Sequence, residues 1–393
     1  MARFFVIAIM ATYALVTGGC AQRLPPLPLH YSQEIAPLGI THSRFYPDTD
    51  LATMEAIGKL SIERERKSAP GGKLPPAQFL AISGGGDNGA FGAGLMCGWT
   101  QRGDRPEFRL VTGVSTGALS APFAFLGPEY DHKLEQVYTQ TTASDVFVAR
   151  PKLFAAIAAD AMTDTAPLRE MISRFVDDLM MQRIAEEYGK GRLLLIMTTN
   201  LDQGRPVIWN IGAIAESRHP KARDLVIDIL VASSAIPGVF PPVMISVEKG
   251  GNEYQEMHVD GGAMAQTFLY PPNFSLERLS RKQGVNRKRS AYIIRNGRLF
   301  RDEAEVSRQT LSVAAHAAST MIAANGTNDT FRIYMTTRRD GVAYNLAYIG
   351  DDFTEPYVGP FDRTYMTKLF NHGFELGKSG NPWHHAPPGY ENE

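Results

Sequence analysis

Short apolar runs alternate with longer segments of helical periodicity from residue 78 onwards. Short runs rich in β-branched and aromatic residues favour strands, and the apolar spacing between them favours amphipathic helices. The alternation predicts an α/β fold, a three-layer sandwich with a mainly parallel central sheet and helices on both faces. We expect strands at QFLAIS (78–83), FRLVTGVS (108–115), RLLLIMTTNL (192–201), SAYIIRNG (290–297) and RIYMTT (332–337).

Residues typical of helix ends and turns predict two helices and one turn in the later part of the chain. Residues 302–324 begin with acidic residues and are followed by Asn325-Gly326, which predicts a helix that stops there. Asp340-Gly341 separates two apolar runs, so it predicts a hairpin and an antiparallel edge to the sheet. Residues 361–380 have a helical pattern.

The first residues follow the pattern of a secretory signal peptide. Arg3 precedes an apolar run over residues 4–16, which is too short to cross the roughly 30 Å hydrocarbon core of a bilayer. Residues 15–20 (LVTGGC) resemble the lipobox of bacterial lipoproteins, which implies lipidation of Cys20. Cleavage by ordinary signal peptidase, releasing a soluble chain from Gln22, is the alternative. We therefore expect an exported, membrane-anchored envelope lipoprotein rather than a soluble periplasmic or secreted protein.

Composition narrows the classes of partner. The formal net charge is -1, from 40 Lys+Arg and 41 Asp+Glu. The protein as a whole therefore has no excess positive charge that would attract it to nucleic acid or to an anionic membrane. We expect no nucleic-acid partner, and any contact with lipid must be local. Of the 2 cysteines, one is Cys20, so no internal disulfide supports the mature domain.

A glycine-rich stretch, SGGGDNGAFGAG (83–94), follows the first expected strand. Gly84, Gly86 and Gly89 match the G-x-G-x-x-G fingerprint of dinucleotide-binding folds, but the acidic residue that would hold the ribose after the second strand is missing. No Gly-Lys-Ser/Thr closes the loop, so the Walker pattern is absent too. We therefore expect no nucleotide and no other cofactor.

The second expected strand ends in GVSTG, a G-x-S-x-G motif that an apolar helical pattern follows. Strand, sharp turn and helix in this order are the setting of a nucleophile elbow, in which Gly113 and Gly117 relieve crowding. Ser115 would lie at the helix N-terminus, where free amides and the helix dipole favour a developing alkoxide. Ser115 is therefore a candidate nucleophile, and a tight turn without chemistry is the alternative.

A candidate base comes from MHVDGGAM (257–264), where Asp260 follows a short apolar run. A strand that ends there would deliver the carboxylate into a cleft, although Asp-Gly is also a common turn pair. The alternative is a Ser-His-Asp triad with His258, which in a strand would face the same side as Asp260. We expect partial burial of Asp260, because an exposed aspartate with a pKa near ~3.9 is a poor base at neutral pH.

Together, SGGGDNGAFGAG, GVSTG and VDGG resemble the three motifs of the patatin-like phospholipases, and the resemblance covers roughly residues 77–350. VASSAIPGVFPPV (231–243) is also similar to a segment that shapes the acyl pocket of that family. The resemblance implies a patatin-like fold and a Ser-Asp dyad, with Ser115 as nucleophile and Asp260 as base. It also implies an oxyanion hole formed by the glycine loop: Gly84, Gly85 and Gly86.

The activity implied by this resemblance is a serine acyl-ester hydrolase of phospholipase A or lysophospholipase type that works through an acyl-enzyme. Its partners would be an acyl lipid or phospholipid substrate and, through Cys20, a membrane; the oligomeric state stays open. We expect no metal, because no other ligand residue clusters with Asp87 and Asn88. Asn88 stands where the family's loop usually has Arg or Lys, so a non-catalytic envelope lipoprotein that serves as a binding scaffold is the alternative.

These features divide the chain into four parts. A signal peptide with a lipobox-like end occupies residues 1–20, and an N-terminal extension or linker follows over residues 21–75. The patatin-like catalytic domain would span residues 76–350. Residues 351–393 would form a C-terminal helix and tail.

Overall fold

The structure is a computed structural model that describes residues 23–149, 163–299, 308 and 310–390. The expected signal peptide and Cys20 lie outside the described residues. Part of the helix expected over residues 302–324 lies outside them as well.

A mixed sheet of nine strands forms the centre of the described part of the chain, with the order β1-β7-β6-β3-β2-β10-β11 and with β9 paired to β6 and β8 to β9. The five neighbours from β6 to β11 are parallel to one another, whereas β1, β7, β8 and β9 join by antiparallel pairing. The strands are β1 (Arg44–Phe45), β2 (Ala77–Ile82), β3 (Leu110–Val114), β6 (Leu193–Asn200), β7 (Arg205–Asn210), β8 (Val243–Lys249), β9 (Asn252–Asp260), β10 (Arg289–Arg295) and β11 (Ala343–Tyr348). A separate short pair consists of β4 (Val148–Ala149) and β5 (Thr163–Asp164).

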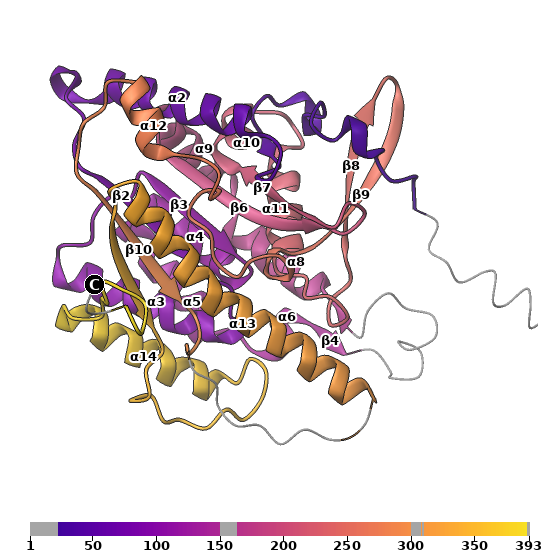
Figure 1. The fold of residues 1–393 in the computed structure, drawn as a ribbon. Helices are drawn as coiled ribbons and strands as arrows, with labels where there is room; N and C mark the ends of the chain where they lie inside the picture. The colour runs from indigo at the N-terminus through magenta and orange to yellow at the C-terminus, as the bar shows by residue number, and fades with distance from the viewer. Residues whose placement is uncertain (1–22, 150–162, 300–307, 309, 391–393) are drawn as a thin grey trace, which may run out of the picture.

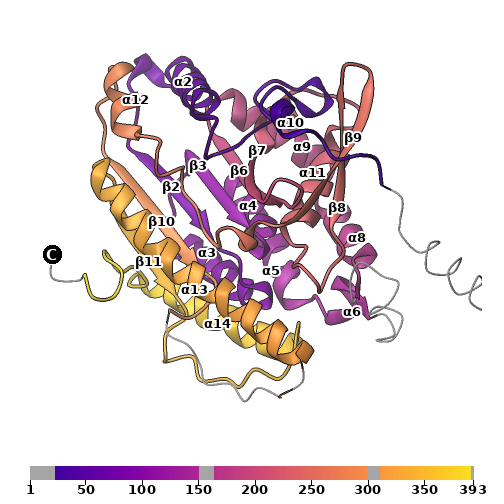
Figure 2. The ribbon, with the colours of Figure 1, turned by 45° about the vertical axis from the view of Figure 1, so that its right-hand side comes forward.

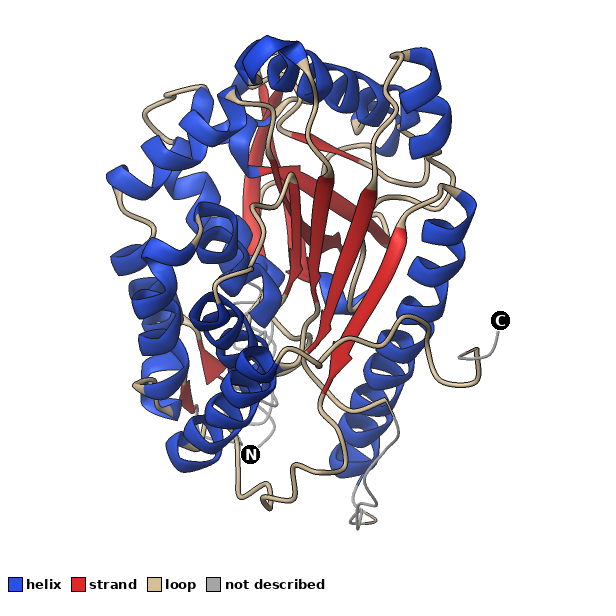
Figure 3. Ribbon diagram, turned by 90° about the vertical axis from the view of Figure 1, so that its left-hand side faces the viewer, coloured by secondary structure: helices blue, strands red, loops and turns tan. Residues whose placement is uncertain are grey.

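Helices cover both faces of the sheet (Figures 1 and 3). The larger cluster of buried apolar side chains packs α3, α4, α5, α8, α9, α11 and α14 onto one face, and a second cluster packs α2, α12 and α13 onto the other. The predicted three-layer α/β fold is therefore confirmed. The helices are α2 (Leu51–Ser68), α3 (Gly89–Arg102), α4 (Thr116–Leu126), α5 (Asp131–Thr139), α6 (Ala143–Val146), α8 (Ala166–Phe175), α9 (Asp178–Gly189), α10 (Ile211–Glu216), α11 (Ala222–Ser233), α12 (Leu276–Lys282), α13 (Thr310–Arg339) and α14 (Arg363–Ser379).

Three sequence expectations fail around α13. Residues 332–337 are helical rather than a strand, because the helix buries Ile333 and Tyr334 in the second cluster. The hydroxyls of Thr336 and Thr337 bond back to carbonyls one turn earlier. The helix also continues through Asn325-Gly326. There the missing side chain of Gly326 makes room for the guanidinium of Arg295, so this glycine serves packing and does not stop the helix.

The predicted hairpin at Asp340-Gly341 is also wrong. Gly341, with φ +64°, follows the end of α13, and β11 then enters the sheet parallel to β10. The sheet therefore has a parallel strand at this edge, and its antiparallel strands lie on the other side of β6. By contrast, the helix predicted over residues 361–380 is confirmed as α14.

The segments on either side of the expected catalytic domain pack onto the same body. β1 pairs with β7, and residues 23–34 run along the β8–β9 hairpin, where the carbonyl of Pro25 accepts from the backbone of Gln255 (Figures 1 and 2). At the other end, α14 packs closely on α3. The two helices approach so closely that a side chain on Gly94 or Gly377 would collide with the facing backbone. Within the described ranges, no helix combines the length and apolar character needed to cross a bilayer.

Candidate active site

Ser115 lies at the junction of β3 and α4 in a backbone conformation that few residues other than glycine adopt. Its φ is +56° and its ψ is -127°, and the helix begins at the next residue. A Cβ on Gly113 would collide with the backbone of Gly117, and a Cβ on Gly117 would collide with the backbone of Ile82. Both glycines of the motif are therefore required by the close approach of strand and helix.

A hydrogen-bond relay from α11 holds this turn. The Ser115 N–H donates to Ser233 Oγ over 3.0 Å, and that hydroxyl donates in turn to the carbonyl of Met197 on β6 over 2.7 Å. All three residues are buried. The turn is thus also held by Ser233, a residue outside the three motifs.

Asp260 ends β9 and points toward Ser115. The Gly262 N–H donates to the Asp260 carboxyl over 2.7 Å, and the Ser115 side chain lies near enough to lower the pKa of that carboxyl. Asp260 is only 4% exposed, and this burial raises its pKa to about 7 against the opposing effect of Ser115 and Gly262. The carboxyl therefore exchanges its proton near neutral pH.

The glycine loop follows β2 and faces the same point. The Gly84 N–H donates to the carbonyl of Gln266 over 2.9 Å, so it anchors the loop. In the described part of the chain, the N–H groups of Gly85 and Gly86 have no hydrogen-bond partner, and Gly86 borders the same cavity as Ser115. Of the three predicted oxyanion donors, Gly85 and Gly86 are thus free to bind an anionic oxygen.

Asn296, the residue after β10, supports the loop from behind. Its Nδ2 donates to the Ser83 carbonyl over 2.9 Å, and its backbone N–H donates to Ser83 Oγ over 2.7 Å. A Cβ on Gly85 would collide with the Asn296 carbonyl, which explains the glycine there. The sequence offered no sign of this role, because a partner from another strand leaves no local pattern.

The residues that follow the glycines bind α14 and the segment before it. Asn88 Oδ1 accepts from the Tyr365 hydroxyl over 3.0 Å, and the Asp87 carboxylate accepts from the Phe361 N–H over 3.0 Å. A positive charge reaches the loop from another place: Arg295 Nη1 lies 3.5 Å from the Gly84 carbonyl oxygen. Burial lowers the pKa of this guanidinium to about 10, while Asp329 opposes the shift, so Arg295 stays charged at neutral pH.

His258 is engaged away from Ser115. Its Nδ1 lies 2.9 Å from Thr198 Oγ1 and its Nε2 lies 3.4 Å from the Glu256 carboxylate. The ring is fully buried, and this burial lowers its pKa. Both ring nitrogens are therefore occupied by partners other than the candidate nucleophile.

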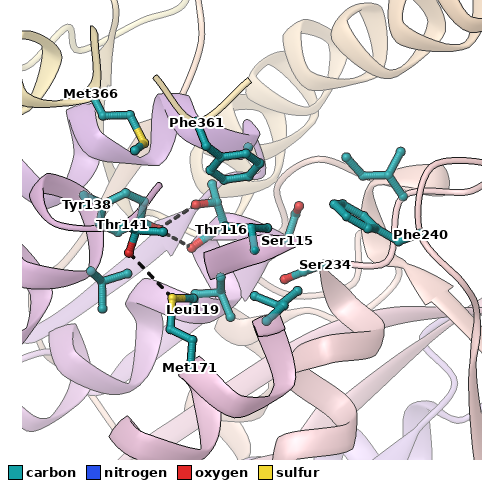
Figure 4. Close-up of a pocket in the computed structure, with 15 residues that line it drawn as sticks. Ser115, Thr116, Leu119, Tyr138, Thr141, Met171, Ser234, Phe240, Phe361 and Met366 are labelled. Carbon is teal, nitrogen blue, oxygen red and sulfur yellow. Dashed lines mark hydrogen bonds between the residues drawn. The ribbon is translucent and has the colours of Figure 1, made fainter. Parts of the chain in front are cut away.

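An apolar cavity of about 50 Å³ extends from Ser115 between α4, α5 and α8 (Figure 4). Thr116 and Tyr138 in its wall bond to each other, so their polar atoms are satisfied. Apolar side chains make up most of the remaining wall: Leu119, Val137, Val146, Leu168, Met171, Ile236, Phe240, Phe361 and Met366. The cavity thus offers an apolar ligand a binding site that begins at the candidate nucleophile.

Comparisons with known proteins agree with the motifs. Residues 80–271 match the family model described as Patatin-like phospholipase. A comparison with curated proteins gave no match. Among solved structures, VipD from Legionella pneumophila is 12% identical with a TM-score of 0.38, over 77% of this chain and 67% of that one. The type III effector protein ExoU is 12% identical with a TM-score of 0.30, over 78% of this chain and 53% of that one.

The matched residues include the glycine loop, Ser115 and Asp260. This match supports a lipid hydrolase. Residues 80–271 of the chain are thus identified as a patatin-like phospholipase domain.

Proposed function

We propose that this protein is a serine acyl-ester hydrolase of phospholipase A or lysophospholipase type, with Ser115 as nucleophile and Asp260 as base. The observation that carries the proposal is the proximity of the Ser115 side chain to a buried carboxyl, that of Asp260, whose pKa burial raises to about 7. A carboxylate with this pKa is a far better proton acceptor at neutral pH than an ordinary aspartate.

Acylation begins when Asp260 accepts the Ser115 proton and Oγ attacks the ester carbonyl carbon. The tetrahedral intermediate collapses, the alcohol oxygen leaves, and that oxygen takes the proton from Asp260. Water then gives a proton to Asp260 and attacks the acyl-enzyme, and Ser115 Oγ recovers the proton as the fatty acid departs. One carboxyl thus acts as base and acid in turn.

The negative oxygen of each tetrahedral intermediate would be bound by the N–H groups of Gly85 and Gly86. Gly86 borders the cavity beside Ser115, and in the described part of the chain neither N–H has a hydrogen-bond partner. The loss of one such donor typically slows an enzyme by ~10² to 10³. Gly84 would contribute by fixing the loop, since its own N–H is bound to Gln266.

The apolar cavity indicates that the acid part of the ester is an acyl chain. Its wall is mostly apolar, and the polar atoms of Thr116 and Tyr138 are already hydrogen-bonded, so a polar acid would lose most of its hydration there. The headgroup side of the substrate would lie toward the glycine loop. Phospholipids, lysophospholipids and other acyl lipids all satisfy this description.

Labelling with a fluorophosphonate probe tests the proposal directly, since this reagent modifies activated serines. The mature domain, residues 22–393, would be compared with Ser115→Ala and Asp260→Asn, and each variant would be checked for cooperative unfolding. We expect labelling of the wild type alone, at Ser115 by peptide mass spectrometry. Ser120→Ala, which changes a buried serine on the same helix, should still label.

The competing function is a binding scaffold that has kept the fold and lost the chemistry. It would be favoured by a folded wild type that stays unlabelled both alone and with phospholipid vesicles. Release of fatty acid from those vesicles by the wild type, absent in Ser115→Ala, would exclude it.

We further propose that Cys20 is lipidated and holds the protein on a bacterial envelope membrane. The lipobox-like residues 15–20 motivate this proposal. Mass spectrometry of the mature N-terminus from a bacterial host should show a diacylglyceryl-modified Cys20, and Cys20→Ala should release the protein from the membrane fraction. An unmodified N-terminus at Gln22 would instead show ordinary signal-peptidase cleavage.

A further inference from the structure

We propose that Met171 is a movable divider that sets the length of acyl chain the enzyme accepts. The inference rests on the acyl-ester hydrolysis proposed above and adds a chain-length specificity to it. It comes from a second cavity, which lies beyond the one at Ser115 and shares part of its wall.

The two cavities have three residues in common: Leu119, Val137 and Met171. Ser115 borders the first cavity and does not border the second. The other residues around the second are all apolar: Pro122, Phe123, Ile172, Phe175, Val176, Met180 and Leu230. The shared residues therefore stand between the reacting ester and a further apolar compartment.

The sizes of the two spaces show why the divider matters. The first cavity measures about 50 Å³ and the second about 20 Å³. A water-sized group needs roughly 10–15 Å³ of such space. The first cavity therefore has room for only a few methylene-sized groups, and the second cavity has room for one or two. A short acyl chain fits in front of the divider, whereas a long chain must displace it.

Two of the shared residues have branched side chains with fewer conformations than methionine. Leu119 lies one turn beyond Ser115 on α4. Val137 is a buried, β-branched residue on α5 with a restricted side chain.

Met171 differs in chemistry and in setting. It is half-buried on α8, within the apolar face that Leu168, Ile172 and Phe175 form at helical spacing. Methionine is unbranched and has several rotatable bonds, so it adapts its shape at low cost. Among the described residues, its sulfur has one weak hydrogen bond, of 3.6 Å from the Thr141 hydroxyl (Figure 4). Rotation of this side chain would join the two cavities.

Chain-length profiles test the divider. Purified wild type, Met171→Ala and Met171→Phe would be assayed for kcat/KM on p-nitrophenyl esters from butyrate to palmitate. In Met171→Ala we expect the optimum to move to longer chains, with a gain of roughly fourfold for each added methylene that becomes buried. In Met171→Phe we expect long esters to lose activity while short esters keep theirs.

Controls separate the divider from general loosening of the fold. Met181→Ala changes a buried methionine on α9 that borders neither cavity, and it should keep the wild-type profile. Met171→Leu should restore a profile close to wild type. Thermal unfolding would verify that every variant is folded.

The outcomes distinguish this inference from the proposed function. If Ser115 reacts with fluorophosphonate and esters are cleaved, but all Met171 variants share one chain-length profile, the divider is disproved and the hydrolase stands. If the folded wild type neither labels nor cleaves any ester, the hydrolase itself fails, and the divider with it.

Discussion

The backbone N–H of Ser115 and the hydroxyl of Ser233 form a 3.0 Å hydrogen bond that ties the turn at the end of β3 to the end of α11. Ser233 has no access to solvent. Its loss would leave the Ser115 N–H buried without a partner, which typically costs 1–3 kcal/mol. A strained turn that loses such a partner is expected to relax, and Ser115 would then move relative to Asp260.

Ser233→Ala should therefore lower kcat more than it raises KM, by about tenfold or more, because the misplaced group is the nucleophile itself. Steady-state kinetics with a short-chain ester would measure this. Ser280→Ala is a suitable control, because Ser280 is also buried but bonds to Arg289 at another place in the fold. If Ser233→Ala and the wild type have equal kinetics, the conformation of the turn at Ser115 does not depend on Ser233.

Activity should depend on the protonation of Asp260. The base must be unprotonated to accept the Ser115 proton, and burial raises its pKa to about 7. We therefore expect kcat/KM for an uncharged ester to be constant above pH 7 and to fall roughly tenfold per pH unit below it. A profile that stays flat down to pH 5 would mean that Asp260 is not the base.

Asp260 should also reduce stability at neutral and alkaline pH. Its pKa is higher in the folded state, about 7, than in the unfolded chain, so the folded state binds the proton more tightly. The stability linked to this proton is fully present below about pH 4 and is lost as the pH rises through 7. The difference of about three units corresponds to an upper limit of roughly 4 kcal/mol.

Asp260→Asn, which cannot ionise, should therefore gain stability relative to the wild type between pH 5 and pH 8. Urea unfolding at both pH values would measure this gain. Ser115→Ala keeps the carboxyl and removes a group that lowers its pKa, so the stability of this variant should fall with pH at least as much as that of the wild type. An Asp260→Asn variant that parallels the wild type at both pH values would contradict the raised pKa.

The buried ion pair between Arg44 on β1 and Glu256 on β9 predicts a further stability effect. Burial alone would raise the pKa of Glu256, but Arg44 and the hydrogen bonds lower it to about 2, so the carboxylate is charged. Arg44→Met should destabilise the fold by about 3–5 kcal/mol, because it leaves that charge unpaired. The double variant Arg44→Met/Glu256→Gln should recover most of the loss in denaturant unfolding, and failure to recover would show that Arg44 acts through packing alone.

The sequence predicted the layered sheet and the positions of the three motifs because their signals are local. Strand, turn and helix follow one another around Ser115, and a glycine pattern is visible without any partner. The residues that support these motifs were not predicted. Ser233, Gln266 and Asn296 act through contacts between distant strands and helices, and such contacts leave no periodicity in the chain.

The errors near α13 have the same origin. The run at 332–337 contains β-branched and aromatic residues and so favoured a strand, but its neighbours on both sides are helical and the helix continues through it. Gly326 was predicted to end the helix. The sequence did not reveal that the guanidinium of Arg295 packs where a side chain of residue 326 would lie. Tertiary packing decided both positions.

The pairing of β2 with β10 has a consequence for the order of folding. The strand before the glycine loop lies between β3 and β10, and the residue that braces the loop, Asn296, follows β10 late in the chain. Contacts between such distant segments form slowly, because a long loop must close before they yield any stability. A chain that ends before residue 296 lacks this brace, so we expect the glycine loop to be held in place only after the late strand β10 has joined the sheet.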